Sequence, residues 1–263
     1  MARFLMKLSY DGCGYHGWQK QHNGISIQAV LERALETFAH TYIPITGAGR
    51  TDAGVHALGQ YAHFDYQGRM QPEQMLLAFK RYLPNDIKVL QILRVSPYLS
   101  ARYQAFERSY RYILAKEITP FNRHYTGYLP HVNLSLAPMQ TAALQLLGSH
   151  DFSSFGRANP EIPNHICDVL SLTITETAET YEFLITADRF LHNMVRRIVG
   201  TLANIAHFNL PPQTIDAILS DACPRQNLVT TAPASGLYLM DVKYPVMLLD
   251  ESAEANILET LKR

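Results

Sequence analysis

The 263-residue sequence lacks the features that define several protein classes. It has only three cysteines, Cys13, Cys167 and Cys223, and no C-x-x-C pair, which argues against a disulfide framework and a structural zinc site. No apolar run approaches the roughly 20 residues that a membrane helix needs, and the N-terminal apolar stretch is too short for a signal peptide. Lys plus Arg equals Asp plus Glu at 23 each, so the strong basic excess of a general nucleic-acid binder is absent. We therefore expect a globular, cytoplasmic protein.

The glycine-rich segment GAGRTDAG at residues 47–54 does not meet the requirements of a phosphate-binding loop. Val55 and His56 follow it where a P-loop needs Lys and then Ser or Thr. In a dinucleotide fingerprint, Asp52 would occupy the third glycine position and its charge would face the pyrophosphate. Two interpretations remain: a tight turn that Asp52 caps, or a reactive carboxylate beside Arg50.

A metal site has little support in the sequence. His63 and Asp65 share a strand face with Tyr61 and, together with His56, are candidate ligands. A further ligand has no evident source, so we expect no metal site.

A basic and aromatic segment lies between Ala101 and His131, in the middle of a chain with no net charge. Its basic residues outnumber its acidic ones and are Arg102, Arg108, Arg111, Lys116 and Arg123. Within ERSYRYIL, period-2 alternation places Tyr110 and Tyr112 on one face of a predicted strand. Such a face suits base stacking combined with phosphate contact, and it equally suits a plain core, so both interpretations stay open.

Hydrophobic periodicity predicts the element order βαββαβ twice. The first set consists of strands at 4–10, 42–47, 59–66 and 87–95 and helices that begin at Ser26 and near Pro72. The second set consists of strands at 105–115, 168–175, 181–187 and 237–243 and helices at 138–147 and 192–206. This order is typical of ferredoxin-like and RNA-recognition folds, in which helices cover one face of an antiparallel sheet. We predict an α+β fold of two such halves, divided into domains 1–100 and 101–263.

The segment FLHNMVRRIVG at residues 190–200 predicts a buried helix that carries Arg196 directly after the core residue Val195. An arginine beside a buried stripe needs an anionic partner, from another element or from a ligand. Asp52 is an available candidate.

Seven segments of this sequence resemble the tRNA pseudouridine synthase A family in order and spacing, over nearly the whole chain. They are YDGCGYHGWQKQ (10–21), SIQAVLERAL (26–35), GRTDAGVHA (49–57), RSYRYI (108–113), HDFSSF (150–155), FLHNMVRRIVG (190–200) and APASGLYL (232–239). The resemblance implies an enzyme that isomerises uridine to pseudouridine at positions 38, 39 and 40 in the anticodon stem and loop of tRNA. It also implies that the enzyme works as a homodimer, without cofactor or metal.

The resemblance further implies roles for four residues in an active-site cleft between the two halves. Asp52 is the catalytic residue, and Tyr110 lies against the target base. Arg196 pairs with Asp52, and Arg50 helps to hold the extruded nucleotide.

The sequence departs from the family at its expected phosphate contacts. The family commonly has an arginine directly after the DFSSF segment, whereas here Gly156 precedes Arg157. We therefore expect phosphate contacts from Arg157, Arg102 or Arg123.

The reaction breaks the bond from N1 to C1′, turns the uracil within the site and joins C5 to C1′. An ionised carboxylate suits the electron-poor C1′, and a nearby cation favours the ionised form in a dry pocket. Asp52 can add to C1′, remove the C2′ proton to give a glycal, or add to uracil C6; the sequence leaves the three routes open. The base has to flip out first, and Gly49, Ala53 and Gly54 would let the loop approach the ribose.

Two other functions remain in consideration from the residues alone. A non-catalytic RNA-binding protein with two RRM-like halves explains the basic, aromatic strand but gives Asp52 no task. An enzyme that binds a phosphate cofactor through GAGRTDAG is the other, and for this one we expect no nucleotide binding.

Overall fold

A computed structural model describes residues 1–130, 134–157, 164–221 and 227–249, so Cys223 lies outside the described part. The chain forms two compact units, one from Met1–Phe106 with the described residues 240–249, and one from the described part of Glu107–Leu239. Both contain helices and antiparallel strands, which confirms the α+β class. A compact unit need not be a domain, so the division into 1–100 and 101–263 stays a prediction. None of the described helices is long and apolar enough to cross a membrane.

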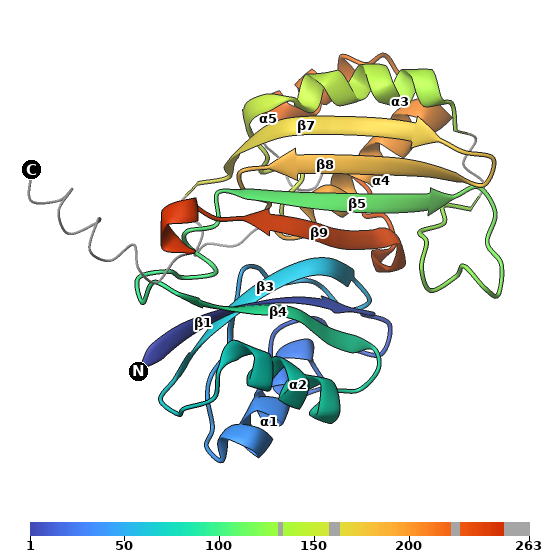
Figure 1. The fold of residues 1–263 in the computed structure, drawn as a ribbon. Coiled ribbons are helices and arrows are strands. Elements are labelled where there is room, and N and C mark those ends of the chain that lie inside the picture. Colours follow the sequence, from blue (N-terminus) through green and yellow to red (C-terminus); the bar gives the residue numbers. More distant parts are fainter. Residues whose placement is uncertain (131–133, 158–163, 222–226, 250–263) are drawn as a thin grey trace, which may run out of the picture. The chain divides into compact units, whose positions relative to one another are not determined.

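The first unit consists of a sheet and two helices that lie on the same side of it (Figure 1). Its elements are β1 (Ala2–Tyr10), α1 (Ile27–Ala39), β2 (Thr46–Gly47), β3 (His56–Tyr66), α2 (Pro72–Tyr82), β4 (Ile87–Val95), the end of β9 (Leu237–Lys243) and the 3-10 turn η3 (Val246–Leu248). β1 pairs antiparallel with β3 and β4, and β2 pairs antiparallel with β3. The element order βαββαβ that the sequence predicts for this part is present.

Local sequence explains the helices of this unit. The Ser26 side chain accepts a hydrogen bond from Ala29 N and caps α1, whose apolar stripe buries Leu31 and Leu35 completely. α2 buries Phe79 in the same core. These elements confirm the helices predicted from Ser26 and near Pro72.

The strand predicted at 42–47 is much shorter than expected, since β2 contains only Thr46 and Gly47. Pro44 has no N–H to offer a ladder. The N–H of Ile45 donates to the Glu32 carboxylate at 3.1 Å instead of to a strand. A side chain of α1 therefore takes the hydrogen bond that would extend β2.

The second unit consists of a four-stranded antiparallel sheet with helices packed on it. Its elements are β5 (Glu107–Ala115), α3 (Leu136–Ala143), the 3-10 turn η1 (Leu144–Leu146), β6 (Gly148–Asp151), β7 (Ile166–Glu176), β8 (Thr180–Ala187), α4 (Met194–His207), α5 (Thr214–Asp221), the 3-10 turn η2 (Ala234–Gly236) and the start of β9. The strands lie in the order β5, β8, β7, β6. α3 packs on α4 and β7, and α4 contacts β5.

This unit has two elements that the periodicity does not predict, β6 and α5. The four residues of β6, GSHD, contain no apolar alternation, and α5 is only eight residues long. The helix predicted at 138–147 begins and ends earlier, at Leu136 and Ala143, and continues as η1. α4 has the predicted buried face, including Ile198 and Leu202.

Candidate functional site

Asp52 lies in a tight turn between β2 and β3. Val55 N donates to Asp52 O at 3.2 Å, and Gly54 takes a φ of +78° inside the turn, a conformation that glycine adopts without strain. Asp52 is half-buried, whereas Arg50 and Ala53 are exposed. The turn thus holds a partly desolvated carboxylate at the surface of the first unit, close in sequence to an exposed guanidinium.

Thr51, the residue before Asp52, is fixed through both its side chain and its backbone. Its Oγ1 lies 2.7 Å from the buried hydroxyl of Tyr10, and its carbonyl accepts from Trp18 N at 3.0 Å. Gly17 has a φ of +83°, and a Cβ there would lie 2.6 Å from Thr51 O. The segment from residue 10 to residue 18 therefore packs directly against the backbone that leads into Asp52.

The other end of the turn is held by His56. Gly12 N donates to His56 Nδ1 at 3.1 Å, and Asp11 Oδ1 lies 3.2 Å from the same nitrogen. A Cβ on Gly12 would overlap with Val55 O, so only glycine fits at this contact. The Asp52 turn is thus clamped on both sides by one preceding loop.

The glycines near Asp52 serve different purposes. A Cβ on Gly47 would lie 2.5 Å from the ring of Trp18, so this glycine is needed for packing. A Cβ on Gly49 would meet nothing within 4 Å. Packing inside the unit does not fill the space beside Gly49, so this space leaves room for a ligand.

Tyr110 lies on β5 in the second unit, opposite Ile185 of β8. It is half-buried and makes an edge-to-face contact with Phe190, with ring centroids 5.1 Å apart. Tyr112, two residues later on the same face, belongs to the core, and its hydroxyl donates to Pro233 O at 2.9 Å. Of the two tyrosines on this predicted stacking face, only Tyr110 retains partial exposure.

Arg196 lies in the first turn of α4 and is half-buried. Its Nε donates to Ala232 O at 2.8 Å, and its Nη1 donates to Asn193 Oδ1 at 3.0 Å. Asn193 itself takes a left-handed φ of 66° at the helix N-cap. These bonds orient the guanidinium from its own unit, and the expected pairing with Asp52 stays a prediction.

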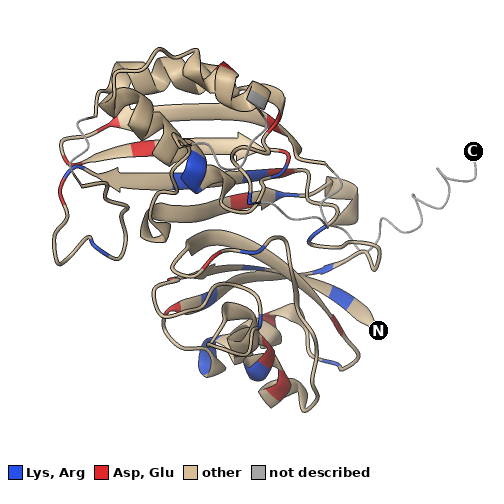
Figure 2. Ribbon diagram, turned by 180° about the vertical axis from the view of Figure 1, so that it is seen from behind, with Lys and Arg blue, Asp and Glu red and all other residues tan. Residues whose placement is uncertain are grey.

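A second arginine, Arg197, follows Arg196 and makes α4 basic at its start (Figure 2). Burial and the charge of Arg157 lower the pKa of Arg197. Its guanidinium donates to Gly156 O, while its buried Nε has no hydrogen-bond partner among the described residues. Two like charges close together in this way favour binding of an anion.

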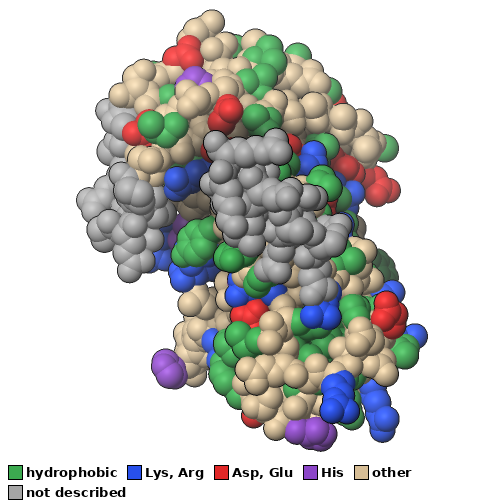
Figure 3. Space-filling model, turned by 60° about the vertical axis from the view of Figure 1, so that its left-hand side comes forward, with side chains coloured by type: hydrophobic (Ala, Val, Ile, Leu, Met, Phe, Trp, Pro, Cys, Tyr) green, Lys and Arg blue, Asp and Glu red, His purple; other side chains and the backbone are tan. Residues whose placement is uncertain are grey.

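The surface is not uniformly basic on the face in Figure 3, where basic, hydrophobic and acidic side chains all occur. This agrees with the equal numbers of acidic and basic residues in the chain. Because the chain has no net charge, attraction of an anionic partner depends on local groups of basic residues.

Comparison with known proteins decides between the candidate functions. A sequence model of the family described as tRNA pseudouridine synthase matches residues 7–104 and 142–245. The tRNA pseudouridine synthase A of Bacteroides fragilis is 42% identical, over 93% of this chain and 97% of its own length. The proteins of the same name from Bacteroides thetaiotaomicron and Exiguobacterium sibiricum are 38% and 37% identical, over 99% and 93% of this chain and 97% and 98% of their own lengths.

The chain belongs to the tRNA pseudouridine synthase family.

It is an isomerase that converts uridine in tRNA to pseudouridine. We therefore reject the alternative of a non-catalytic RNA-binding protein. The residues that match the family model include Arg50, Asp52 and Arg196. Tyr110 lies between the two matched ranges, so its assignment depends on the RSYRYI segment alone.

The tRNA pseudouridine synthase has one group of three possible metal ligands among its described residues, formed by Asp11, Cys13 and His56. Hydrogen bonds inside the protein account for this arrangement, since Cys13 N donates to Asp11 Oδ1 at 2.9 Å and Gly12 N donates to His56 Nδ1. Burial and the Asp11 carboxylate raise the pKa of the Cys13 thiol to about 12, so the thiol stays protonated at neutral pH. We interpret the group as part of the clamp on the Asp52 turn.

The candidate ligands His63 and Asp65 also have protein partners. Asp65 accepts two hydrogen bonds from Arg3, each at 2.8 Å, and Ala101 N donates to His63 Nδ1 at 3.0 Å. Burial and the positive charge of Arg3 lower the pKa of His63 to about 4. These residues stabilise the first unit.

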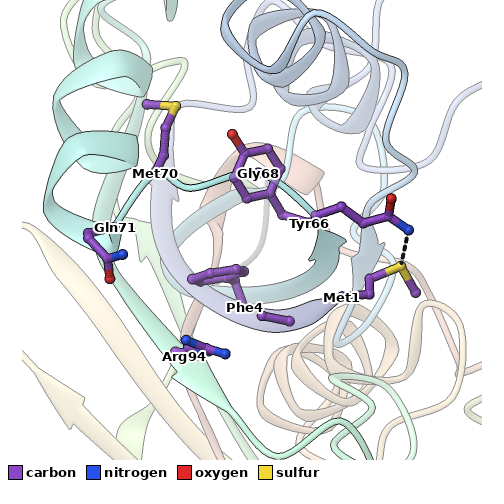
Figure 4. Close-up of a pocket in the computed structure, with 9 residues that line it drawn as sticks. Met1, Phe4, Tyr66, Gly68, Met70, Gln71 and Arg94 are labelled. Atoms are coloured by element: carbon purple, nitrogen blue, oxygen red, sulfur yellow. Dashed lines mark hydrogen bonds between the residues drawn. The ribbon is translucent and has the colours of Figure 1, made fainter.

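A hollow with a cavity volume of about 210 Å³ lies beside the N-terminal end of β1 (Figure 4). Phe4 and Tyr66 line it together with Met70 and Arg94, and Gln67 Nε2 donates to the Met1 sulfur at its edge. None of the residues of the Asp52 turn lines it, so we do not assign the reaction to this hollow.

Several residues that position the turn are not apparent from the sequence alone. The segment YDGCGYHGWQKQ suggests only a glycine-rich loop, yet Tyr10, Gly12, Gly17 and Trp18 all contact the turn that holds Asp52. The signal in the sequence is that closely spaced glycines, among them Gly12 and Gly17, stand near the aromatic residues Tyr10 and Trp18. Such a pattern indicates that two backbones approach each other closely.

Proposed function

We propose that Asp52 is the catalytic residue of this tRNA pseudouridine synthase and that the target uridines are at positions 38, 39 and 40 of the anticodon stem and loop. The observation that carries the proposal is the clamped turn, in which Thr51 and His56 fix the backbone on both sides of a half-buried carboxylate. Preorganised groups contribute to catalysis because the enzyme does not have to order them during the reaction.

The chemistry requires a carboxylate that is charged and close to the ribose. Asp52 adds to C1′, takes the C2′ proton to give a glycal, or adds to uracil C6. In each route the glycosidic bond breaks, the uracil turns in the site, and a bond forms from C5 to C1′ with loss of the C5 proton. The open space beside Gly49 supports close approach of the ribose to the turn.

Three further residues complete the proposed site. Arg196 pairs with Asp52 and favours its ionised form. Tyr110 offers a ring face to the flipped uracil, and its contact with Phe190 supports this because the neighbouring ring holds the tyrosine in one orientation. Arg50, exposed beside the turn, holds the extruded nucleotide.

We also propose the larger assembly that this chemistry needs. The two halves are ferredoxin-like, and a cleft between them receives the flipped base, whose removal from the stack costs a few kcal/mol. Arg157, Arg102 and Arg123 contact phosphates and offset that cost. The enzyme acts as a homodimer in the cytoplasm, where its substrate is found.

Replacement of Asp52 by asparagine tests the central assignment. We expect Asp52→Asn to bind tRNA with unchanged Kd and to release no tritium from tRNA labelled at C5 of uridine. Glu73→Gln is the matched control, because Glu73 is an exposed acid on α2 and its loss should leave turnover unchanged. Turnover by the Asp52→Asn enzyme would show that another residue carries the reaction.

Mapping of pseudouridine in host tRNA tests the target positions. Deletion of the gene should remove pseudouridine at positions 38, 39 and 40 and leave other sites modified. Loss of pseudouridine elsewhere in tRNA, with these three positions intact, would contradict the assigned targets.

A further inference from the structure

The loop between β5 and α3 carries an aromatic side chain that is almost completely exposed to solvent. Phe121 is 91% exposed, the largest value among the exposed large hydrophobic side chains of the described residues. Single apolar side chains are common on protein surfaces, so exposure alone indicates little. The hydrogen bonds that fix this loop and the positive charge that it carries are two independent reasons to assign it a binding role.

The turn that contains Phe121 is fixed by paired hydrogen bonds. Thr119 N donates to Asn122 Oδ1 at 2.7 Å, and Asn122 N donates back to Thr119 Oγ1 at 3.2 Å. Asn122 Nδ2 also donates to Glu117 O at 3.0 Å. The backbone around Phe121 is therefore held in one conformation while the ring points into water.

The same turn is anchored to the rest of the second unit. Thr126 N donates to Asn122 O at 3.0 Å, and Thr126 O in turn accepts from Ser235 Oγ at 2.8 Å. The hydroxyl of Tyr238 donates to Tyr125 O at 2.6 Å. A rigid loop loses little conformational entropy when a ligand binds, so its exposed aromatic side chain can bind a ligand at a low entropic cost.

The loop is basic. Arg123 and His124 are exposed, and the sequence contains no Asp or Glu between Glu117 and Asp151. Figure 2 shows a basic segment and no acidic one at the far end of the loop that follows β5. An anionic partner is favoured there over a basic or neutral one.

We propose that this loop binds tRNA, with the ring of Phe121 stacked on an unpaired base and Arg123 on a neighbouring phosphate. An aromatic ring combined with an arginine is a common way for proteins to hold unpaired nucleotides. Arg123 donates to Pro120 O, and its remaining N–H groups are sufficient for a phosphate. The assignment concerns substrate binding and does not require Asp52 to be the catalytic residue.

Binding measurements on the full-length enzyme test the stacking contact. We expect Phe121→Ala to raise the Kd for tRNA about tenfold, with kcat at saturating tRNA unchanged. Phe121→Tyr should bind like the wild type because it keeps a ring, whereas Phe121→Leu should bind as weakly as the alanine variant. Arg123→Gln should reduce the slope of log Kd against log salt by about one.

Phe208→Ala is the matched control, since Phe208 is an exposed aromatic at the end of α4 in the same unit. Its tRNA affinity should equal that of the wild type. Wild-type affinity of Phe121→Leu, or an equal loss in Phe208→Ala, would overturn the proposal. A change in the association state of Phe121→Ala at unchanged tRNA affinity would also overturn it, in favour of a protein contact. Failure here leaves the Asp52→Asn result unaffected, so the two proposals are separable.

Discussion

The hydroxyl of Tyr10 lies 2.7 Å from Oγ1 of Thr51, and both side chains are buried. This bond joins the end of β1 to the residue before Asp52. It links the strand framework of the first unit to the turn that carries the proposed catalytic carboxylate.

We expect Tyr10→Phe to lower the free energy of unfolding by about 1 kcal/mol, because one buried hydrogen bond is lost. If the bond also positions Asp52, kcat should fall about tenfold or more while the Kd for tRNA stays the same. Thr51→Ser should retain activity, and Thr51→Val should behave like Tyr10→Phe. Measurement of kcat, Kd and chemical denaturation on the same samples separates the two effects.

Tyr66→Phe is the control for this series, since Tyr66 is a buried tyrosine at the opposite end of β3 from the turn. Its kcat should equal that of the wild type. A loss of stability in Tyr10→Phe with unchanged kcat would mean that the bond is only structural.

Two glycines beside the turn should respond differently to alanine. Gly17→Ala forces a side chain into a positive φ and within 2.6 Å of Thr51 O, so the unfolding free energy and kcat should both fall. Gly49→Ala has open space around its Cβ, and its stability should change by less than about 0.5 kcal/mol. If that space receives the ribose, kcat/KM of Gly49→Ala should nevertheless fall about tenfold. Wild-type kcat/KM in Gly49→Ala would show that substrate does not occupy the space.

Stability should depend on pH through His63. Its pKa is lowered to about 4 by burial and by Arg3, whereas the unfolded chain has the ordinary value of about 6.5. Between these values the unfolded state binds more protons, so the free energy of unfolding decreases as the pH falls from about 6.5 to 4. His63→Gln, which keeps an acceptor for Ala101 N, should show a flatter profile over this range. Identical profiles for the two proteins would assign the pH dependence to other groups.

Arg196 should affect the pH dependence of the reaction. Removal of a paired cation disfavours the charged form of a carboxylate, so Arg196→Ala should shift the acid limb of the rate profile to higher pH and reduce turnover. Arg196→Lys keeps the charge but loses the Nε bond to Ala232 O, and its acid limb should stay near the wild-type position. An unshifted limb in Arg196→Ala would reject the pairing with Asp52. Arg69→Ala, which removes an exposed arginine from the first unit, is the control.

Long periodic segments made much of the fold predictable from the sequence. α1 and α4 have continuous apolar stripes, and β9 begins and ends as expected at Leu237 and Lys243. The prediction failed where a distant side chain decides the local structure. β2 is short because Glu32 takes the N–H of Ile45, a contact between residues 13 positions apart.

The candidate site was predictable only in part, for a similar reason. The GRTDAGVHA segment makes Asp52 a candidate, but the bonds that fix its turn form only when the segment from Tyr10 to Trp18 folds against it. His56, a candidate metal ligand from the sequence, accepts the N–H of Gly12. Residue types alone do not distinguish a histidine that binds metal from one that holds a loop.

The first unit needs residues from both ends of the chain. Lys7 forms an ion pair with Asp241 at 2.9 Å, and the hydroxyl of Tyr244 donates to Ala101 O at 2.7 Å. During synthesis on the ribosome, the second unit is therefore fully translated before the first can close its last contacts. Premature termination after residue 239 would leave Lys7 and Ala101 without these partners, so an incomplete polypeptide would lack contacts that close the first unit.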